Sequence, residues 1–252
     1  MKKQRNYFFN ILIFLFLGVF LVSAVVLALL YRDELSMRIG LKKYHNVSSD
    51  ISSQVLPQNP INFTELKQTN EDIYAWIRIP NTNIDYPVAH SQTDDGFYLH
   101  HNIYKRYEFA GTIYSEMQNS QDFSDPNTIL YGHNMSKGYM FQNLYKFQDE
   151  AFFNDNRHFY IYTPGHILTY TIYSAYQYDD RHILNSFDFS DETVFADYIE
   201  STKNPTFMLK NVRKDVSVTT KNRIVTLSTC LGDGKKYRYL VQGVLTDDQP
   251  TQ

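Results

Sequence analysis

The chain has 252 residues, a formal net charge of -3, 43% hydrophobic residues and a single cysteine. This hydrophobic content supports a sizeable core, which excludes a wholly disordered chain. One cysteine excludes an internal disulfide framework. No strong excess of basic residues is present, which argues against a nucleic-acid-binding protein, because such proteins neutralise phosphates with lysine and arginine.

The first sixty residues differ from the rest in charge and hydropathy. They carry a net charge of +4, whereas residues 61–252 carry -7. Residues 7–31 contain no charged side chain, and this run of 25 residues exceeds the roughly 20 that cross a bilayer as a helix. The apolar run continues past Ser23 and Ala24, the small residues of a possible cleavage site, so the pattern favours an uncleaved anchor over a cleaved signal peptide.

Four segments are predicted from this anchor. Residues 1–6 form a cytoplasmic N-terminus, 7–31 a transmembrane signal anchor, 32–60 a juxtamembrane stalk and 61–252 an extracellular domain. Basic residues flank the span on both sides, so the orientation rests on the large domain that follows the first apolar segment. The expected location is the cell membrane, with a single pass and the N-terminus in the cytoplasm.

Beyond residue 60 the sequence has the pattern of a mainly β domain. Short runs rich in tyrosine, isoleucine and threonine alternate with turn residues. The predicted strands are 76–79, 84–86, 109–115, 128–132, 158–162, 168–176, 216–219, 223–229 and 237–245. So many short strands in one domain predict a barrel or a sandwich.

Two segments have helical spacing instead. Apolar residues recur at helical intervals from Met140 to Phe147. Ser190-Asp191-Glu192 supplies an N-cap and an acidic first turn for an amphipathic helix that extends to about Thr202.

The single cysteine, Cys230, ends a predicted strand and precedes a strong turn signal. A hairpin centred on Gly234 places Cys230 opposite Arg238. Directly paired residues have Cβ atoms about 5 Å apart, so a thiol and a guanidinium can share one pocket. A positive charge there favours a thiolate nucleophile or an oxyanion formed on attack. The alternative is a buried, unreactive cysteine, since free cysteines are among the most buried residues.

A cysteine nucleophile requires a histidine, and the sequence has eight. His133 is the leading candidate, because it follows the apolar run Ile129–Tyr131 through Gly132, so that a strand delivers it to an end of the sheet. Glycine at 132 is expected to leave space for a close approach of the substrate. The sequence has no second cysteine and no HExxH-type pair, so no metal site is predicted.

The residues around Cys230 resemble a known family. Thr226-Leu-Ser-Thr-Cys230 resembles the TLxTC signature of sortases, the cysteine transpeptidases of Gram-positive cell walls. Arg238–Leu245 resembles the strand that carries the family's arginine, and Leu130–Met135 resembles the histidine segment of class B sortases. The similarity extends over residues 62–246 in consistent order, and it implies an eight-stranded β-barrel with peripheral helices.

The resemblance implies three catalytic residues. These are Cys230 as the nucleophile, His133 as the general acid/base and Arg238 as the partner of the oxyanion or the substrate carbonyl. To these the sequence adds the backbone N–H of Leu231, next to the nucleophile, as a second oxyanion donor.

Substrate contacts and partners also follow from the resemblance. It implies that Ser228 and Leu99 line the groove for a C-terminal sorting signal. The enzyme is then expected to cleave a Thr–Gly or Thr–Asn type bond of a secreted protein and to join the acyl product to an amine of the peptidoglycan precursor. An alternative within class B is a pilin polymerase that joins pilins through a lysine. No cofactor, metal ion or nucleic acid is expected.

Two interpretations outside the family stay open. One is a hydrolytic cysteine protease, although a papain-like signature around the cysteine is missing. The other is a non-enzymatic, membrane-anchored binding domain in which Cys230 is buried.

Overall fold

The computed structural model describes residues 16–26, 41, 43–44, 56–231 and 236–252. The chain divides into two compact units, Met1–His45 and Asn46–Gln252. Residues 16–26 are helical, but most of the predicted N-terminus, anchor and stalk lies outside the described residues. Among the helices that are described, none has both the length and the apolar composition of a membrane span.

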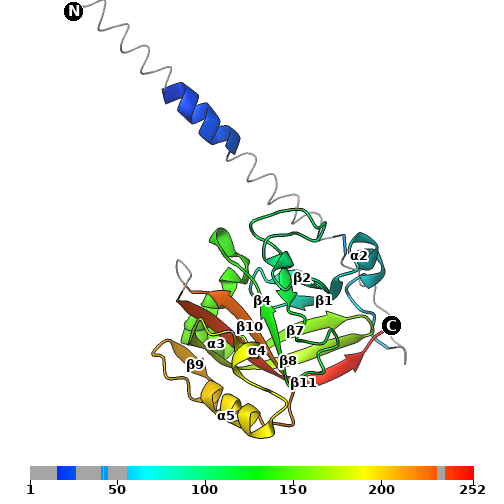
Figure 1. The fold of residues 1–252 in the computed structure, drawn as a ribbon, viewed down its shortest axis with the longest axis vertical. Coiled ribbons are helices and arrows are strands. Elements are labelled where there is room, and N and C mark those ends of the chain that lie inside the picture. Colours follow the sequence, from blue (N-terminus) through cyan, green and yellow to red (C-terminus); the bar gives the residue numbers. More distant parts are fainter. Residues whose placement is uncertain (1–15, 27–40, 42, 45–55, 232–235) are drawn as a thin grey trace, which may run out of the picture. The chain divides into compact units, whose positions relative to one another are not determined.

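The second unit is a closed β-barrel (Figure 1). In its described part, nine strands form one sheet, and β9 (Lys210–Val212) pairs only with β8, so the other eight close into a ring through the pairing of β11 with β8. Around the ring these are β11 (Tyr237–Pro250), β10 (Ile224–Cys230), β4 (Asn127–Tyr131), β3 (Ile113–Ser115), β2 (Asp85–His90), β1 (Ile73–Arg78), β7 (His158–Thr163) and β8 (His166–Asp179). The predicted mainly β, eight-stranded barrel is confirmed.

Two predicted strands are wrong in part or in full. Of the segment 109–115 only β3 is a strand, because Gly111 has a φ of 61° and leaves the extended region. Residues 216–219 form no strand. The edge of β8 that β7 leaves free is taken instead by Lys210–Val212, which pairs with Ser174–Tyr176.

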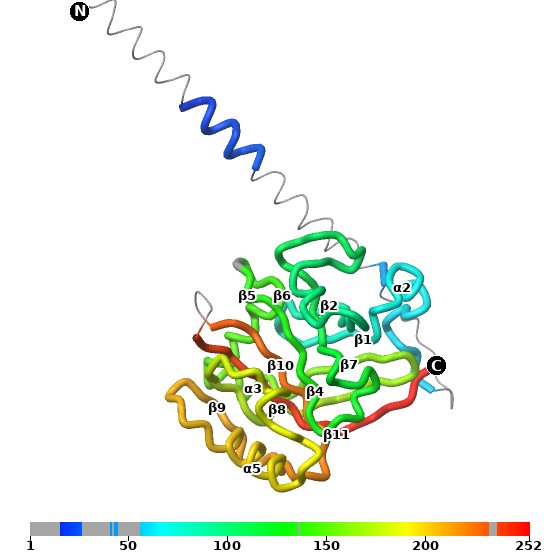
Figure 2. Tube along the Cα trace, viewed as in Figure 1, coloured from blue at the N-terminus to red at the C-terminus, as the bar shows by residue number. Residues whose placement is uncertain are grey.

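Short helices and a small β-pair surround the barrel, and their course is followed most easily in Figure 2. The helices are α2 (Phe63–Thr69), η1 (Phe97–Leu99), η2 (Ser136–Gly138), η3 (Phe141–Gln148), α3 (Glu150–Asp155), α4 (Ile183–Ser186) and α5 (Glu192–Lys203). The pair consists of β5 (Asn134–Met135) and β6 (Tyr139–Met140). The predicted helix at 140–147 is a 3₁₀ helix, η3, rather than an α-helix.

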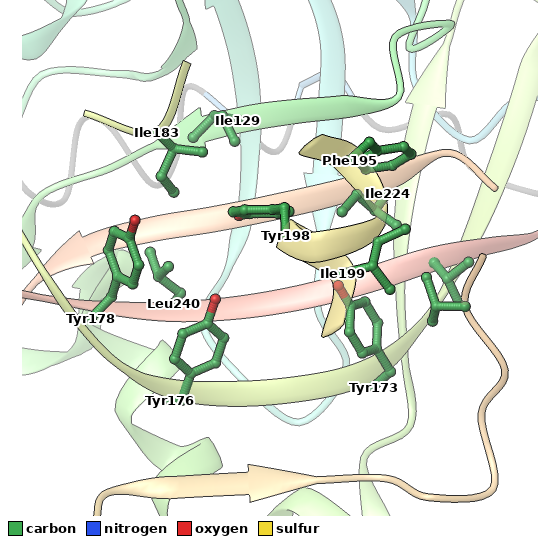
Figure 3. Packing of buried hydrophobic residues seen from close by; sticks show 12 residues of the cluster. Ile129, Tyr173, Tyr176, Tyr178, Ile183, Phe195, Tyr198, Ile199, Ile224 and Leu240 are labelled. Atoms are coloured by element: carbon green, nitrogen blue, oxygen red, sulfur yellow. The ribbon is translucent and has the colours of Figure 1, made fainter. Parts of the chain in front are cut away.

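Helix α5 follows the predicted pattern and covers one face of the barrel. Its N-cap is Asp191, whose carboxylate accepts hydrogen bonds from the backbone N–H groups of Thr193 and Val194 at 2.8 and 3.2 Å. Its inner face buries Phe195, Tyr198 and Ile199. These side chains pack against residues of β8, β10 and β11 in the apolar cluster drawn in Figure 3. The cluster thereby holds the helix against the strands that lead to Cys230 and Arg238.

Strand direction brings the predicted site residues to one end of the barrel. Strands β4 and β10 run parallel, with Tyr131 opposite Ser228. Their carboxyl ends therefore lie side by side, and the residues that follow β4 come next to the last residues of β10. Strand β11 starts at the same end, because it runs antiparallel to β10.

Candidate active site

The β10–β11 hairpin has the predicted register. Cys230 is paired with Arg238, and each side chain is half-buried. The register continues beyond the strand, since the backbone N–H of Leu231 donates to the carbonyl oxygen of Tyr237 at 3.0 Å. The prediction that the cysteine and the arginine face each other across the hairpin is confirmed.

The same hydrogen bond bears on the role expected for Leu231. An oxyanion donor must be free to point at the substrate, but this N–H is used by the hairpin itself. Leu231 is also absent from the residues that line the pocket described below. In this structure the N–H of Leu231 is thus engaged by the hairpin rather than directed at the pocket.

His133 follows β4 at the end of the barrel where β10 ends. The N–H of Gly132 donates to the carbonyl oxygen of Ser228 at 3.1 Å, which extends the β4–β10 pairing by one residue. A Cβ atom at position 132 would lie 2.5 Å from Ile113 Cδ1 and 2.7 Å from the ring of Phe141. Packing therefore requires a glycine here, while Gly132 also lines the pocket described below.

The imidazole of His133 is held by a backbone carbonyl. Its Nε2 lies 2.9 Å from the carbonyl oxygen of Leu99. Burial disfavours the imidazolium and lowers the pKa of His133 below its usual value, a nearby His100 lowers it further, and the hydrogen bond to Leu99 opposes both effects. The neutral imidazole is accordingly favoured near pH 7.

One cavity of about 320 Å³ joins the predicted residues. It is lined by the thiol-bearing Cys230 together with His133, Arg238, Ser228 and Leu99. We call it the Cys230 pocket. The structure therefore brings together the three residues expected to be catalytic and the two expected to contact the substrate.

The far wall of the Cys230 pocket carries a polar cluster that the sequence did not indicate. The Glu116 carboxylate, only 11% exposed, lies 2.8 Å from Nε2 of His182 and accepts a hydrogen bond from the hydroxyl of Tyr131 at 3.3 Å. The Nδ1 of His182 accepts the backbone N–H of Asn185 and caps helix α4. This cluster fastens the pocket wall formed by residues 180–183 to the end of β3.

A further contact missed from the sequence supports the backbone of Cys230. The hydroxyl of Tyr145, in η3, donates to the carbonyl oxygen of Cys230. Its ring packs edge-on against Tyr239 with centroids 5.8 Å apart. The helical spacing of Tyr145 could not indicate this contact, because the hydrogen bond joins residues that are 85 positions apart.

No metal centre is found in the described ranges, where no three His, Cys, Asp or Glu side chains are grouped as ligands. The site thus consists of a thiol, an imidazole and a guanidinium around one pocket. This combination is suited to nucleophilic acyl transfer.

Comparison with known proteins identifies the family. A family model described as the sortase domain matches residues 77–246. The chain belongs to the sortase family. Sortase B of Listeria monocytogenes is 36% identical over 185 residues, which cover 72% of either chain.

Other similar proteins agree on class B. Sortase B of Staphylococcus aureus is 28% identical over 189 residues, or 75% of this chain and 74% of the relative. The crystal structure of Bacillus anthracis sortase B in complex with AAEK1 has a TM-score of 0.72 and 30% identity, and the match covers 86% of this chain and 97% of that one. This chain is therefore a class B sortase and a cysteine transpeptidase, as the TLxTC-like motif and the histidine segment predicted.

Proposed function

We propose that Cys230 is the nucleophile, His133 the general acid/base and Arg238 the group that stabilises the oxyanion. The observation that carries this assignment is that all three line the Cys230 pocket, with the cysteine and the arginine directly paired across a hairpin. Ser228 and Leu99 line the same pocket and are assigned to the sorting signal. A sortase structure from Staphylococcus aureus in complex with substrate, 26% identical with a TM-score of 0.66, supports a pocket for a substrate in this fold.

The reaction proceeds in two acyl transfers. The Cys230 sulfur attacks the carbonyl carbon of a Thr–Gly or Thr–Asn type bond, and its proton passes to His133. The C–N bond breaks as His133 returns that proton to the leaving amine, which leaves a thioester. An incoming amine then attacks the thioester, loses a proton to His133 and releases the free thiol.

Arg238 supplies the electrostatic stabilisation. Its guanidinium donates one hydrogen bond to the carbonyl of Tyr237 at 3.3 Å, and a guanidinium has five N–H donors. Among the described residues its other donors have no hydrogen-bond partner, and they are assigned to the oxygen that becomes negatively charged on attack. Because the N–H of Leu231 is occupied by the hairpin, the oxyanion is assigned to Arg238 alone.

The substrate is proposed to be a secreted protein with a C-terminal sorting signal, and the acceptor an amine of the peptidoglycan precursor. Residues 7–31 are proposed to anchor the enzyme in the cell membrane, with residues 1–6 in the cytoplasm. Residues 32–60 then form the stalk of an extracellular catalytic domain, 61–252. The 25-residue run without charge supports the anchor, and tethering would bring the enzyme to the outer face where such substrates emerge.

Peptide transfer tests the proposed reaction. The full chain in detergent micelles is incubated with an Asn-Pro-x-Thr-x peptide and a small amine, and the products are weighed by mass spectrometry. The expected product is the amine-linked peptide, and it should be absent with Cys230→Ala. Hydrolysed peptide alone would favour a protease, and an untouched peptide would refute this substrate class. In a second assay with a pilin in place of the small amine, transfer to a pilin lysine would point to pilus assembly.

A further inference from the structure

The loop between η1 and β3 holds the ring of His133 from two directions. At its start, the carbonyl oxygen of Leu99 lies 2.9 Å from Nε2 of His133. The rings of His100 and Phe109 stack on His133 with centroids at 5.3 and 5.4 Å. The loop closes on itself, since the N–H of Glu108 donates to the carbonyl of His100 at 2.9 Å.

The contact with Leu99 determines the tautomer of the neutral imidazole. A carbonyl oxygen can only accept a hydrogen bond, so Nε2 must carry the proton. The other nitrogen, Nδ1, is then the basic one. No acidic side chain is hydrogen-bonded to His133 in the part of the chain that the structure describes, so this carbonyl is the group that orients the ring.

Gly111 leaves the space that the Leu99 carbonyl occupies. Its φ is 61°, and a Cβ atom there would lie 2.4 Å from the carbonyl oxygens of both Leu99 and Tyr98. The next residue, Thr112, donates its N–H to the Tyr98 carbonyl at 2.9 Å. A contact of 2.4 Å to backbone atoms leaves no room for a methyl group. A side chain at position 111 would therefore force the backbone to shift and would displace the acceptor that holds His133.

We propose that Gly111 is a positioning residue for catalysis, which acts through the Leu99 carbonyl to select the Nε2–H tautomer of His133 and to direct Nδ1 to the proton transfers. The carbonyl takes the part that an amide or carboxylate side chain has in other cysteine–histidine enzymes. The ring of Phe109, 60% exposed on its outer side, completes the support as a stacking partner. The inference rests on the proposed role of His133 as general acid/base.

The chain offers a matched control for Gly111→Ala. Gly165, in the β7–β8 turn, also has a positive φ of 90°, but nothing lies within 4 Å of a Cβ atom there. Gly165→Ala introduces the same kind of backbone strain without displacing a carbonyl. A difference between the two variants therefore reports on Leu99 and not on the loss of a glycine.

The first measurement is made on the wild-type chain. Labelled with 15N-histidine in detergent micelles, the full chain should show His133 as the Nε2–H tautomer at pH 8, with the signal assigned by its loss in His133→Gln. Gly111→Ala should lose that tautomer preference and lower kcat about 10²-fold, as expected for a displaced catalytic group. Gly165→Ala should retain both.

A second variant tests the stack at Phe109, which is exposed and lies outside the buried core. Phe109→Ala exposes His133 to water and should raise its pKa, whereas loss of the Leu99 hydrogen bond in Gly111→Ala should lower it. The two variants should therefore move the acid limb of the kcat/KM profile in opposite directions.

The outcomes separate this inference from the proposed function. If His133→Gln transfers peptide at the wild-type rate, the assignment of His133 fails, and the positioning role with it. If His133→Gln is inactive but wild-type His133 is the Nδ1–H tautomer, or Gly111→Ala keeps the wild-type kcat, only the positioning role is refuted.

Discussion

Replacing Gln242 by leucine should destabilise the barrel strongly, because this side chain joins strands β8, β10 and β11 to helix α5. Gln242 is fully buried. Its Nε2 donates to the hydroxyls of Tyr198 and Thr226 at 2.8 and 2.9 Å. Its Oε1 accepts from the hydroxyls of Tyr173 and Tyr176 at 3.1 and 3.4 Å. Leucine has a similar volume, so the change removes these bonds with little loss of packing.

The size of the stability loss depends on which hydroxyls keep a hydrogen-bond partner without Gln242. Tyr173 is still 3.0 Å from the hydroxyl of Thr202, and Thr226 still donates to Asn127 at 2.9 Å. Tyr198 keeps Thr226 and Asn127 as partners, and Tyr176 keeps Tyr198. The change therefore removes four neutral hydrogen bonds without leaving a hydroxyl alone. At about 0.5–1.5 kcal/mol each, their loss should lower the free energy of unfolding by about 4 kcal/mol. For a domain of this size that is a fall in Tm of about 8–16 °C.

Urea unfolding of the full chain, followed by near-ultraviolet circular dichroism, measures this loss as a lower midpoint at unchanged slope. Gln249→Leu is the matched control, since Gln249 is exposed on the same strand and its replacement should change the stability by less than about 0.5 kcal/mol. A Gln242→Leu chain within about 1 kcal/mol of the wild type would refute the reasoning, because the network would then contribute little to the barrel.

Three further outcomes are expected. Cys230→Ala and Arg238→Ala should each abolish peptide transfer while Tm changes by less than about 2 °C; a larger fall would mark a structural residue. Glu116→Gln should raise KM about three- to tenfold with kcat within twofold, because the charged hydrogen bond that fastens the pocket wall weakens; an unchanged KM in steady-state kinetics would contradict this. The free energy of unfolding should decrease as the pH falls from about 7 to 5, because burial lowers the folded-state pKa of three histidines below the unfolded value of about 6.5. These are His90, His133 and His158. Urea titrations at each pH measure the trend, and stability that is flat or rises towards pH 5 would contradict it.

Local sequence determined the parts of the site that one hairpin or one helix contains. Cys230 and Arg238 face each other because β10 and β11 pair antiparallel in the register that the sequence predicted. The N-cap at Asp191 and the buried face of α5 likewise follow from residues within a few positions of one another. Such features depend on backbone geometry between near neighbours, which periodicity and turn residues encode directly.

The predicted strand at 216–219 shows where local pattern was insufficient. Its composition suits a strand, and Val218 is buried against the α5 cluster. The free edge of β8 nevertheless pairs with Lys210–Val212. Which of two segments occupies an edge depends on how far β7 extends along β8, and this is a property of the assembled sheet.

Only the tertiary structure decided how the site residues are oriented. His133 is held by a carbonyl 34 residues away, and Glu116 meets His182 across 66 residues. The N–H of Leu231 is consumed by the hairpin, and the space beside Gly132 is filled by Ile113 and Phe141. The sequence thus determined the family, the barrel and which residues are the candidates for catalysis. Hydrogen-bond partners and packing arise from contacts between distant segments, which no local pattern contains.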